Sequence, residues 1–222
     1  MFKKYWKFFV IFWSVVLVGI IGVFVFFWLI SAGKLGFMPT FEELENPNNR
    51  FASEVYFADG PIMNRYFEKE NRKYIEYREI PQSVIDALIA TEDVRFYDHS
   101  GVDVRGLFRV AKGLLTANTS AGGGSTISQQ LAKMLFPRES DLNVFELAIR
   151  KFREWVIAVR LEKSYTKEEI LTMYLNKYDF LNLAVGISSA ADIYFQVPLD
   201  SLKVEQAAML IGMAKNSSYY NP

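Results

Sequence analysis

The pattern at the start of the chain is an uninterrupted apolar run from Phe8 to Ile30. These 23 residues carry no charge, and as an α-helix they would span roughly 34 Å, enough for a hydrocarbon core of about 30 Å. A cleaved signal peptide is the alternative, because lysines precede the run and Ser31–Gly33 are small, but its apolar part is only about 7 to 15 residues long. We therefore predict a membrane anchor over residues 1–33.

The charges that flank the run predict its orientation. Lys3, Lys4 and Lys7 precede it and only Lys34 lies just after it, and positively charged flanks stay on the cytoplasmic side. We therefore expect a single-pass protein with its N-terminus inside and the rest of the chain outside. Residues 34–50 are rich in Pro, Asn and charge and are predicted to form a connector.

The pattern after the connector predicts a small hairpin and then helices. β-type residues at 53–58 and 62–67 flank Asp59-Gly60, which is a turn signal. After Pro81 the periodicity is helical. The predicted helices cover 82–97, 103–115, 126–136, 142–163, 167–177, 183–195 and 203–214. Residues 51–222 are therefore predicted to form one mainly α domain.

Composition narrows the chemistry. Basic and acidic residues are equal at 25 each, and the part after the anchor is slightly acidic, so a nucleic-acid surface is not expected. The chain has no cysteine and one histidine, which excludes disulfides, thiolate metal sites, a Cys nucleophile and a multi-His metal centre. Carboxylates, hydroxyls, amides and basic side chains are left to carry any reaction.

One carboxylate lies on an apolar face. In the helix after Pro81 the stripe Ile85, Leu88 and Ile89 continues onto Glu92 and then Phe96. A glutamate that loses water becomes a better proton acceptor near neutral pH, which is how enzymes prepare a general base. The alternative is that the helix ends there and Glu92 is solvated.

A glycine-rich segment opens directly onto a helix. Residues 122–130 read GGGSTISQQ, and Thr126 with Gln129 fits a capping box. Free N–H groups at such a helix start bind anions, and Lys133 one turn later adds positive charge. The segment matches neither a P-loop nor a dinucleotide fingerprint. A flexible linker before a well-capped helix is the alternative.

A further polar group lies on the long helix that follows. Arg150 and Lys151 precede Glu154 by four and three residues, so the three side chains can meet on one face. They form either a solvated ion-pair cluster or a second acidic site with cations placed for a phosphate. His99, in turn, follows a helix end, where a lone imidazole is more often a hydrogen-bonding bracket for a turn than a catalyst.

Together and in this order, the segments resemble the peptidoglycan glycosyltransferase domain of class A penicillin-binding proteins and monofunctional transglycosylases. Glu92–Gly101 resembles the family's E-D-x-x-F-x-x-H-x-G, and Gly124–Lys133 its G-[AG]-S-T-I-[TS]-Q-Q-L-x-K segment. Arg150–Glu154 resembles R-K-x-x-E, and Glu205–Leu210 with Lys215-Asn216 and Tyr220–Pro222 resembles the closing motif. The resemblance extends from about residue 41 to the last residue.

The resemblance implies a lysozyme-like α-helical glycosyltransferase domain with a small N-terminal β-hairpin, on the outer face of the bacterial cytoplasmic membrane. It implies an enzyme that polymerises lipid II with inversion and release of undecaprenyl pyrophosphate, with Glu92 as general base. Glu154 would act at the pyrophosphate through a divalent cation, Mg or Mn, or by orienting nearby cations, and no organic cofactor is expected. Expected partners are lipid II, the growing glycan, the membrane and other cell-wall synthesis proteins. The residues expected to bind substrate are Asp93, Phe96, His99, Arg109, Ser125, Thr126, Gln129, Gln130, Lys133, Arg150, Lys151 and Asn176.

The chain also departs from the family pattern. Residues 145–148 lack the basic residue that usually precedes R-K-x-x-E, and residues 178–183 replace a glycine-rich Y-F-G-x-G run. The sequence ends at Pro222, where the family continues, so we expect a truncated form. Two alternatives remain: a lysozyme-like enzyme that cleaves glycan with Glu92 as general acid, and an inactive membrane-anchored scaffold.

Overall fold

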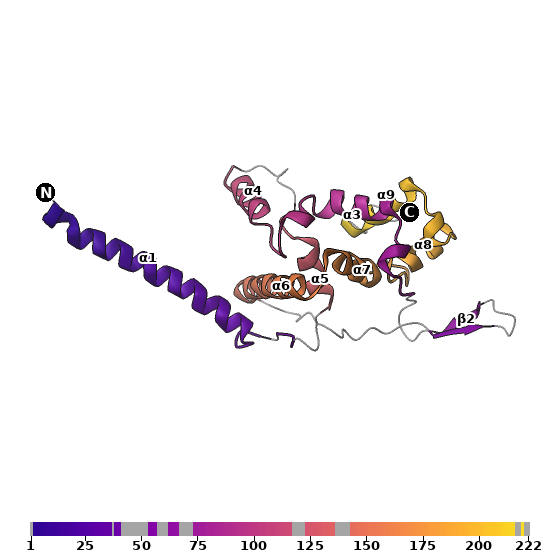
Figure 1. Ribbon diagram of the computed structural model, residues 1–222, viewed down its shortest axis with the longest axis horizontal. Coiled ribbons are helices and arrows are strands. Elements are labelled where there is room, and N and C mark those ends of the chain that lie inside the picture. Colours follow the sequence, from indigo (N-terminus) through magenta and orange to yellow (C-terminus); the bar gives the residue numbers. More distant parts are fainter. Residues whose placement is uncertain are drawn as a thin grey trace.

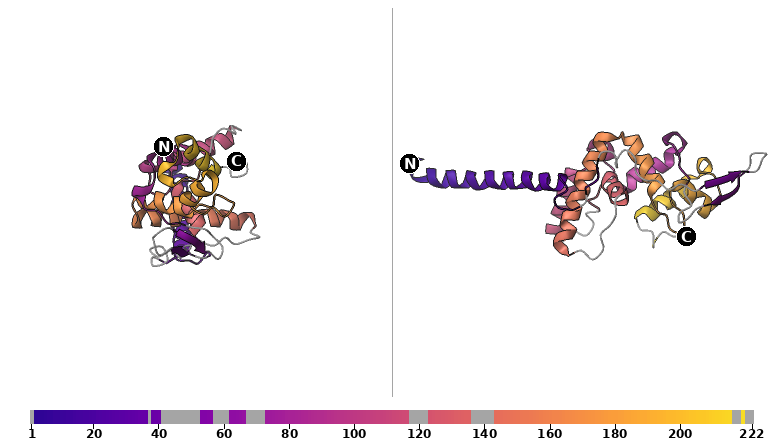
Figure 2. Two further views of the ribbon diagram at one scale, coloured as in Figure 1. Left: turned by 90° about the vertical axis from the view of Figure 1, so that its right-hand side faces the viewer. Right: turned by 90° about the horizontal axis from the view of Figure 1, so that it is seen from below.

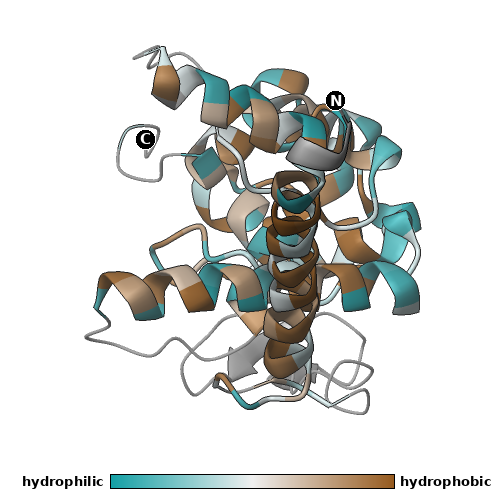
Figure 3. Ribbon diagram, turned by 90° about the vertical axis from the view of Figure 1, so that its left-hand side faces the viewer, coloured by the Kyte–Doolittle hydropathy of each residue, from teal (hydrophilic) through white to brown (hydrophobic). Residues whose placement is uncertain are grey.

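The structure is a computed structural model, and it describes residues 2–36, 38–40, 53–56, 62–66, 73–116, 123–135, 143–215 and 219. It is mainly helical, as predicted (Figure 1). Helix α1 spans Phe2–Ser31, and its segment Tyr5–Ser31 is long and apolar enough to cross a membrane. None of the most apolar window of that segment is buried within the protein. Figure 3 shows apolar residues along its length.

Helix α1 projects from the helical domain and packs at its C-terminal end against α6, which spans Val144–Ser164 (Figures 1 and 2). The ring of Phe152 contacts the rings of Phe26 and Phe27 edge-on, at centroid distances of 5.3 and 5.7 Å. The Arg160 guanidinium donates to the Ser31 carbonyl at 2.8 Å, so a cation satisfies a carbonyl at the end of the helix. The C-terminal end of the anchor helix is therefore packed directly against α6.

The domain core lies among the helices that follow. Helix α3 packs against α9, α5 packs against α6 and α7, and α8 contacts α7 and α9. The core includes Ile85, Leu88, Leu131, Leu161 and Tyr174, all at most 2% exposed. The helices are α3 (Gln82–Glu92), α4 (Val104–Leu115), α5 (Ile127–Leu135), α6, α7 (Lys167–Lys177), α8 (Ile187–Phe195) and α9 (Val204–Lys215), with 3-10 turns η1 (Tyr77–Glu79), η2 (Phe96–Asp98) and η4 (Leu199–Ser201).

Local polar residues explain where two of these helices begin. The Asn143 side chain accepts from the Glu146 N–H while Glu146 bonds back to the Asn143 N–H, and Thr166 and Glu169 form the same reciprocal pair at α7. Each box satisfies two backbone N–H groups that a helix start leaves without partners. These two helices therefore begin where their sequences place a cap.

Two predicted helix boundaries were wrong. The helix predicted over 82–97 ends at Glu92, because Asp93 leaves helical geometry at φ −157° and ψ 75°. The helix predicted over 183–195 begins only at Ile187, because the three residues 181–183 all have positive φ, between 50° and 66°. Non-glycine residues adopt that conformation at a cost, so helical periodicity there did not indicate a helix.

The only strands in the described part of the chain are β1 (Ser53–Tyr56) and β2 (Ile62–Tyr66). They pair antiparallel, with an irregularity in the register between Val55 and Tyr56. The predicted Asp59-Gly60 turn lies outside the described residues, as do connector residues 41–50.

Candidate active site

A pocket of about 290 Å³ lies where the end of α3, the start of α4 and the loop before α5 meet. Residues 91–95 and 123–126 line two sides of it, and Asp103, Gly106 and Arg109 line the side of α4. Lys215, at the end of α9, completes the lining. Four segments far apart in the sequence thus meet at one cavity that contains Glu92.

Glu92 is the last residue of α3, and one of its two carboxylate oxygens is fixed. The Gln130 amide Nε2 donates to Glu92 Oε2 at 2.7 Å, and the Tyr174 hydroxyl donates to Gln130 Oε1 at 3.1 Å. Burial, followed by the negative charge of Glu92, raises the pKa of Tyr174 well above its usual value, so its hydroxyl keeps the proton that orients the Gln130 amide. Within the described residues, Glu92 Oε1 has no hydrogen-bond partner.

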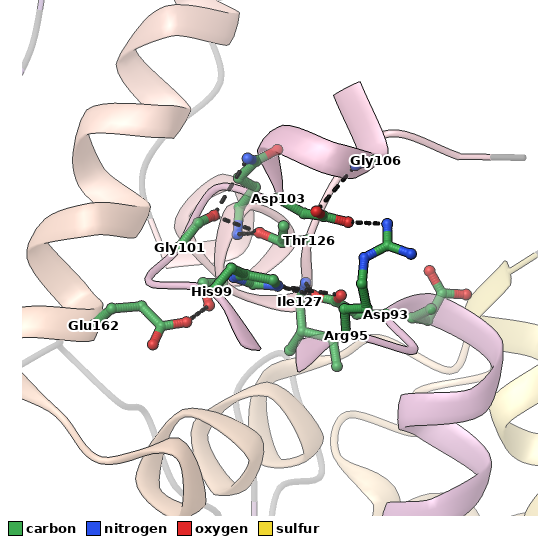
Figure 4. Close-up of polar contacts among 12 residues, drawn as sticks. Asp93, Arg95, His99, Gly101, Asp103, Gly106, Thr126, Ile127 and Glu162 are labelled. Atoms are coloured by element: carbon green, nitrogen blue, oxygen red, sulfur yellow. Dashed lines mark hydrogen bonds and ion pairs between the residues drawn. The ribbon is translucent and has the colours of Figure 1, made fainter. Parts of the chain in front are cut away.

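Asp93 faces inward and ties α3 to the start of α5 (Figure 4). Its carboxylate pairs with His99 Nε2 at 3.0 Å and accepts from the Ile127 N–H at 3.1 Å. The side chains of Asp93 and His99 are 5% and 7% exposed. This arrangement fits the interpretation of His99 as a bracket for a turn. Both residues were expected to bind substrate; Asp93 lines the pocket, whereas His99 is not among the lining residues.

Thr126 also bonds inward, to the carbonyl of Gly101 (Figure 4), and Gln129 donates to the same carbonyl. Thr126 Oγ1 donates to it at 2.7 Å and Gln129 Nε2 at 3.3 Å. Thr126 Oγ1 accepts from the Gln129 N–H at 3.2 Å, which is one half of the predicted capping box. The reciprocal half of the box is not formed, because Gln129 Oε1 has no partner among the described residues.

The polar cluster on α6 reaches the pocket through Ser125. Lys151 Nζ lies 2.8 Å from Glu154 Oε2 and donates to Ser125 Oγ at 2.8 Å. Glu154 is 8% exposed, whereas 41% of the Lys151 side chain is open to solvent. The ion pair with Glu154 and the hydrogen bond to Ser125 hold the Lys151 ammonium next to a residue that lines the pocket. Half-buried Arg150 lies next to Lys151 on α6.

The remaining predicted site residues lie elsewhere. Phe96 is fully buried under the Lys167 ammonium, which is 4.2 Å from its ring centroid. The Asn176 amide is bonded to both the N–H and the carbonyl of Ile75, at 3.0 and 2.8 Å. Lys133 is exposed on α5. The structure thus brings Glu92, Arg109, Ser125, Thr126 and Asp93 to one pocket, with Gln130 behind Glu92 and Lys151 and Glu154 behind Ser125.

The donor set around Glu154 does not fit a metal held by the protein alone. Glu154 supplies one carboxylate, and an oxygen of that carboxylate is already paired with Lys151. In the parts of the chain that the structure describes, no group of three or more His, Cys, Asp or Glu residues could hold an ion. Mg²⁺ in proteins is usually bound by one or two carboxylates together with waters and substrate phosphates, so an ion at Glu154 would have to be held jointly with the substrate.

Sequence reasoning missed four residues at this site. Arg95, Asp103 and Lys215 line the pocket, and Tyr174 orients Gln130. The available signal was charge at helix ends: Asp103 directly precedes α4 and Lys215 is the last residue of α9. Which ends converge on one cavity depends on the packing of α3 against α9, which local sequence does not encode.

Comparison with known proteins shows the family to which the chain belongs. A sequence model of the transglycosylase family matches residues 59–222. The chain is 37% identical to penicillin-binding protein 1A of Escherichia coli K12 and 38% identical to that of Pseudomonas aeruginosa PAO1. Each alignment runs over 185 residues, which is 83% of this chain and 21% and 22% of those two proteins. Penicillin-binding protein 1A of Neisseria meningitidis MC58 is 36% identical over the same length. The chain spans about a fifth of the length of these curated relatives. It belongs to the transglycosylase family, as its motifs predicted.

Proposed function

We propose that this chain polymerises lipid II into glycan strands at the outer face of the cytoplasmic membrane, as a peptidoglycan glycosyltransferase. The observation that carries the proposal is how the Glu92 carboxylate is hydrogen-bonded and where its side chain lies. One oxygen is held by Gln130, and the other is buried without a hydrogen-bond partner in the described structure. The Glu92 side chain lines a pocket shared with Arg109 and Ser125.

Glu92 acts as the general base. Its carboxylate takes the proton from the 4-hydroxyl of the acceptor sugar while the oxygen of that hydroxyl attacks the anomeric carbon of the donor. Gln130 keeps Oε2 in place, so the carboxylate does not rotate as it becomes protonated. The bond between the donor's anomeric carbon and the pyrophosphate oxygen breaks, and the configuration inverts because attack and departure occur on opposite faces. General-base catalysis of this kind contributes about 10² to 10⁴ in rate.

The cations on the other side of the pocket stabilise the departing pyrophosphate. Arg109 lines the pocket directly, and Lys151 is held at Ser125 by its pair with Glu154. Positive groups that are already in place when charge develops lower the barrier without reorganisation. Glu154 therefore acts by fixing Lys151. Undecaprenyl pyrophosphate leaves from this side.

The anchor fits a substrate whose lipid stays in the bilayer. Helix α1 is long enough to cross a membrane and is packed onto α6, the helix that carries Lys151 and Glu154. We infer an N-terminus in the cytoplasm and a catalytic domain outside, from the lysines that precede the apolar run.

Polymerisation of purified lipid II by the detergent-solubilised chain tests this function. We expect glycan that a muramidase digests, and a loss of about 10² to 10⁴ in rate for Glu92→Gln, which keeps the shape but cannot accept the proton. Glu168→Gln is the matched control, because Glu168 is exposed on α7. Shortening of added glycan would instead indicate a cleaving enzyme. A folded parent that changes neither substrate would indicate a scaffold.

A further inference from the structure

An ion pair joins the loop after α3 to the start of α4. An amino group of the Arg95 guanidinium contacts Asp103 Oδ2, and Figure 4 shows the two side chains meeting beside Gly106. Asp103 Oδ1 also accepts from the Gly106 N–H at 2.9 Å, and its backbone carbonyl accepts from the Leu107 N–H at 3.0 Å. Asp103 thus caps the first turn of α4 while Arg95 holds its carboxylate.

The absence of a side chain at position 106 makes room for this pair. A Cβ at Gly106 would lie 2.5 Å from Asp103 Oδ2 and 3.3 Å from the Arg95 Nη2. Any other residue there would push the two charged groups apart. Arg95, Asp103 and Gly106 therefore form one unit, which we call the α4 latch.

The latch remains charged at neutral pH. Burial alone would raise the pKa of the Asp103 carboxyl, but hydrogen bonds from Arg95 and the Gly106 amide outweigh it and lower the pKa below its usual value. The same hydrogen bond raises the pKa of the Arg95 guanidinium. The side chains are 28% and 14% exposed, so water only partly screens the pair.

Helix α4 in turn contacts the glycine loop, residues 123–125, which also lines the pocket. Arg109, one turn after Gly106, donates to the Gly123 carbonyl at 3.4 Å. A Cβ at Gly124 would lie 3.2 Å from Val110 Cγ2, so the loop backbone lies directly against α4. The next residue is Ser125, which accepts from Lys151 at 2.8 Å. The start of α4 is therefore connected to the cationic side of the pocket.

We propose that Arg95 is a positioning residue for the transfer reaction: through Asp103 it fixes α4, and α4 holds Arg109 and the Gly123–Ser125 loop at a set distance from Glu92. The inference rests on the proposed function and adds to it a residue that acts on substrate binding. Arg95 follows Glu92 by three residues. The latch therefore joins the segment that carries Glu92 to helix α4, which lines another side of the pocket. Glu92 keeps its separate support from Gln130.

Steady-state kinetics of the full detergent-solubilised chain with lipid II test the latch. For Arg95→Gln and Asp103→Asn we expect KM to rise and kcat to fall, with kcat/KM about ten-fold lower. The loosened wall weakens substrate binding and also misplaces the cations that stabilise the departing pyrophosphate, while Glu92 keeps its own support. Arg95→Lys should recover part of the loss. The double variant should be no worse than either single variant, because both remove one interaction. Arg105→Gln is the matched control, since Arg105 is exposed on α4.

The possible outcomes separate the latch from the proposed function. Unchanged KM in Arg95→Gln, with an active parent, overturns the latch and leaves the proposed function standing. A rise in KM for Arg95→Gln but not for Asp103→Asn also overturns it, because Arg95 would then act on the substrate directly. A folded parent that makes no polymer refutes the proposed function itself. For the parent and the charge variants, melting temperatures measured alongside separate a loss of folding from a loss of positioning.

Discussion

Replacing Gly101 with alanine should destabilise the domain more than any other single methyl group added near the site. Gly101 has φ +93°, and a Cβ there would lie 2.8 Å from the backbone of Ala158 and Val159 in α6. The left-handed conformation costs a non-glycine residue about 1 to 2 kcal/mol. Overpacking against backbone, which cannot rotate away, adds about 1 to 3 kcal/mol. Together they predict a loss of about 3 kcal/mol.

The assay is the melting temperature of the detergent-solubilised chain, followed by circular dichroism. For a domain of this size about 3 kcal/mol lowers the melting temperature by roughly 6 to 12 °C. Gly123→Ala is the control, because no atom lies within 4 Å of a Cβ built at Gly123, and it should change the melting temperature by about 2 °C or less.

The same substitution should also lower activity below the melting temperature. The Gly101 carbonyl accepts from Thr126 and Gln129, so a shift of residue 101 away from α6 moves the start of α5. Ser125 then loses its 2.8 Å contact with Lys151. A Gly101→Ala chain that melts within about 2 °C of the parent would refute the reasoning, since it would mean that α6 yields to the methyl group without cost.

Two further substitutions test other parts of the domain. One asks whether Asn176 stabilises the fold or binds substrate, and the other tests the residues with positive φ before α8. Asn176→Ala should lower the free energy of unfolding by about 2 to 4 kcal/mol, because it leaves the buried N–H and carbonyl of Ile75 without partners. The KM for lipid II should stay unchanged. A rise in KM with an unchanged melting temperature would instead support the substrate-binding role predicted from its motif. Leu183→Asn should raise stability by about 0.5 to 1 kcal/mol, because Leu183 has φ +66° and is 61% exposed, and asparagine tolerates that conformation better. Chemical denaturation measures both changes, and a Leu183→Asn variant less stable than the parent would contradict the second.

Much of the local structure follows from the sequence, because the determining residues lie within one turn of each other. The apolar run gives α1, and the stripe of Ile85, Leu88 and Ile89 faces the core as predicted, with Ile85 and Leu88 buried and Ile89 packed at its margin. The same stripe continues to Glu92, which lines the pocket. Local periodicity did not show that α3 ends at that residue. The end depends on the backbone turn at Asp93, which is held from α5 by the Ile127 N–H.

The predicted start of α8 was wrong for a different reason. The helix was predicted to begin at residue 183, yet residues 181–183 all have positive φ. Hydrogen bonds fix them in that conformation: the Ala184 N–H donates to the Leu181 carbonyl at 2.7 Å, and the Gly186 N–H donates to the Tyr178 carbonyl at 2.8 Å. Strained backbone persists where the surroundings determine it. The family's glycines in this segment would have marked the turn, and this chain forms it without them.

The same physics limits how far a motif identifies substrate contacts. A buried polar group needs a partner, so a residue can be required for folding as strictly as for binding. Asp93, Thr126 and Asn176 all bond to distant backbone atoms, across 34, 25 and 101 residues. Glu92 differs, because one of its oxygens is still without a partner in the described chain while its side chain lines the pocket. Of the three carboxylates that line the pocket, Glu92, Asp93 and Asp103, only Glu92 has an oxygen without a partner in the described chain, and only the folded structure shows this difference.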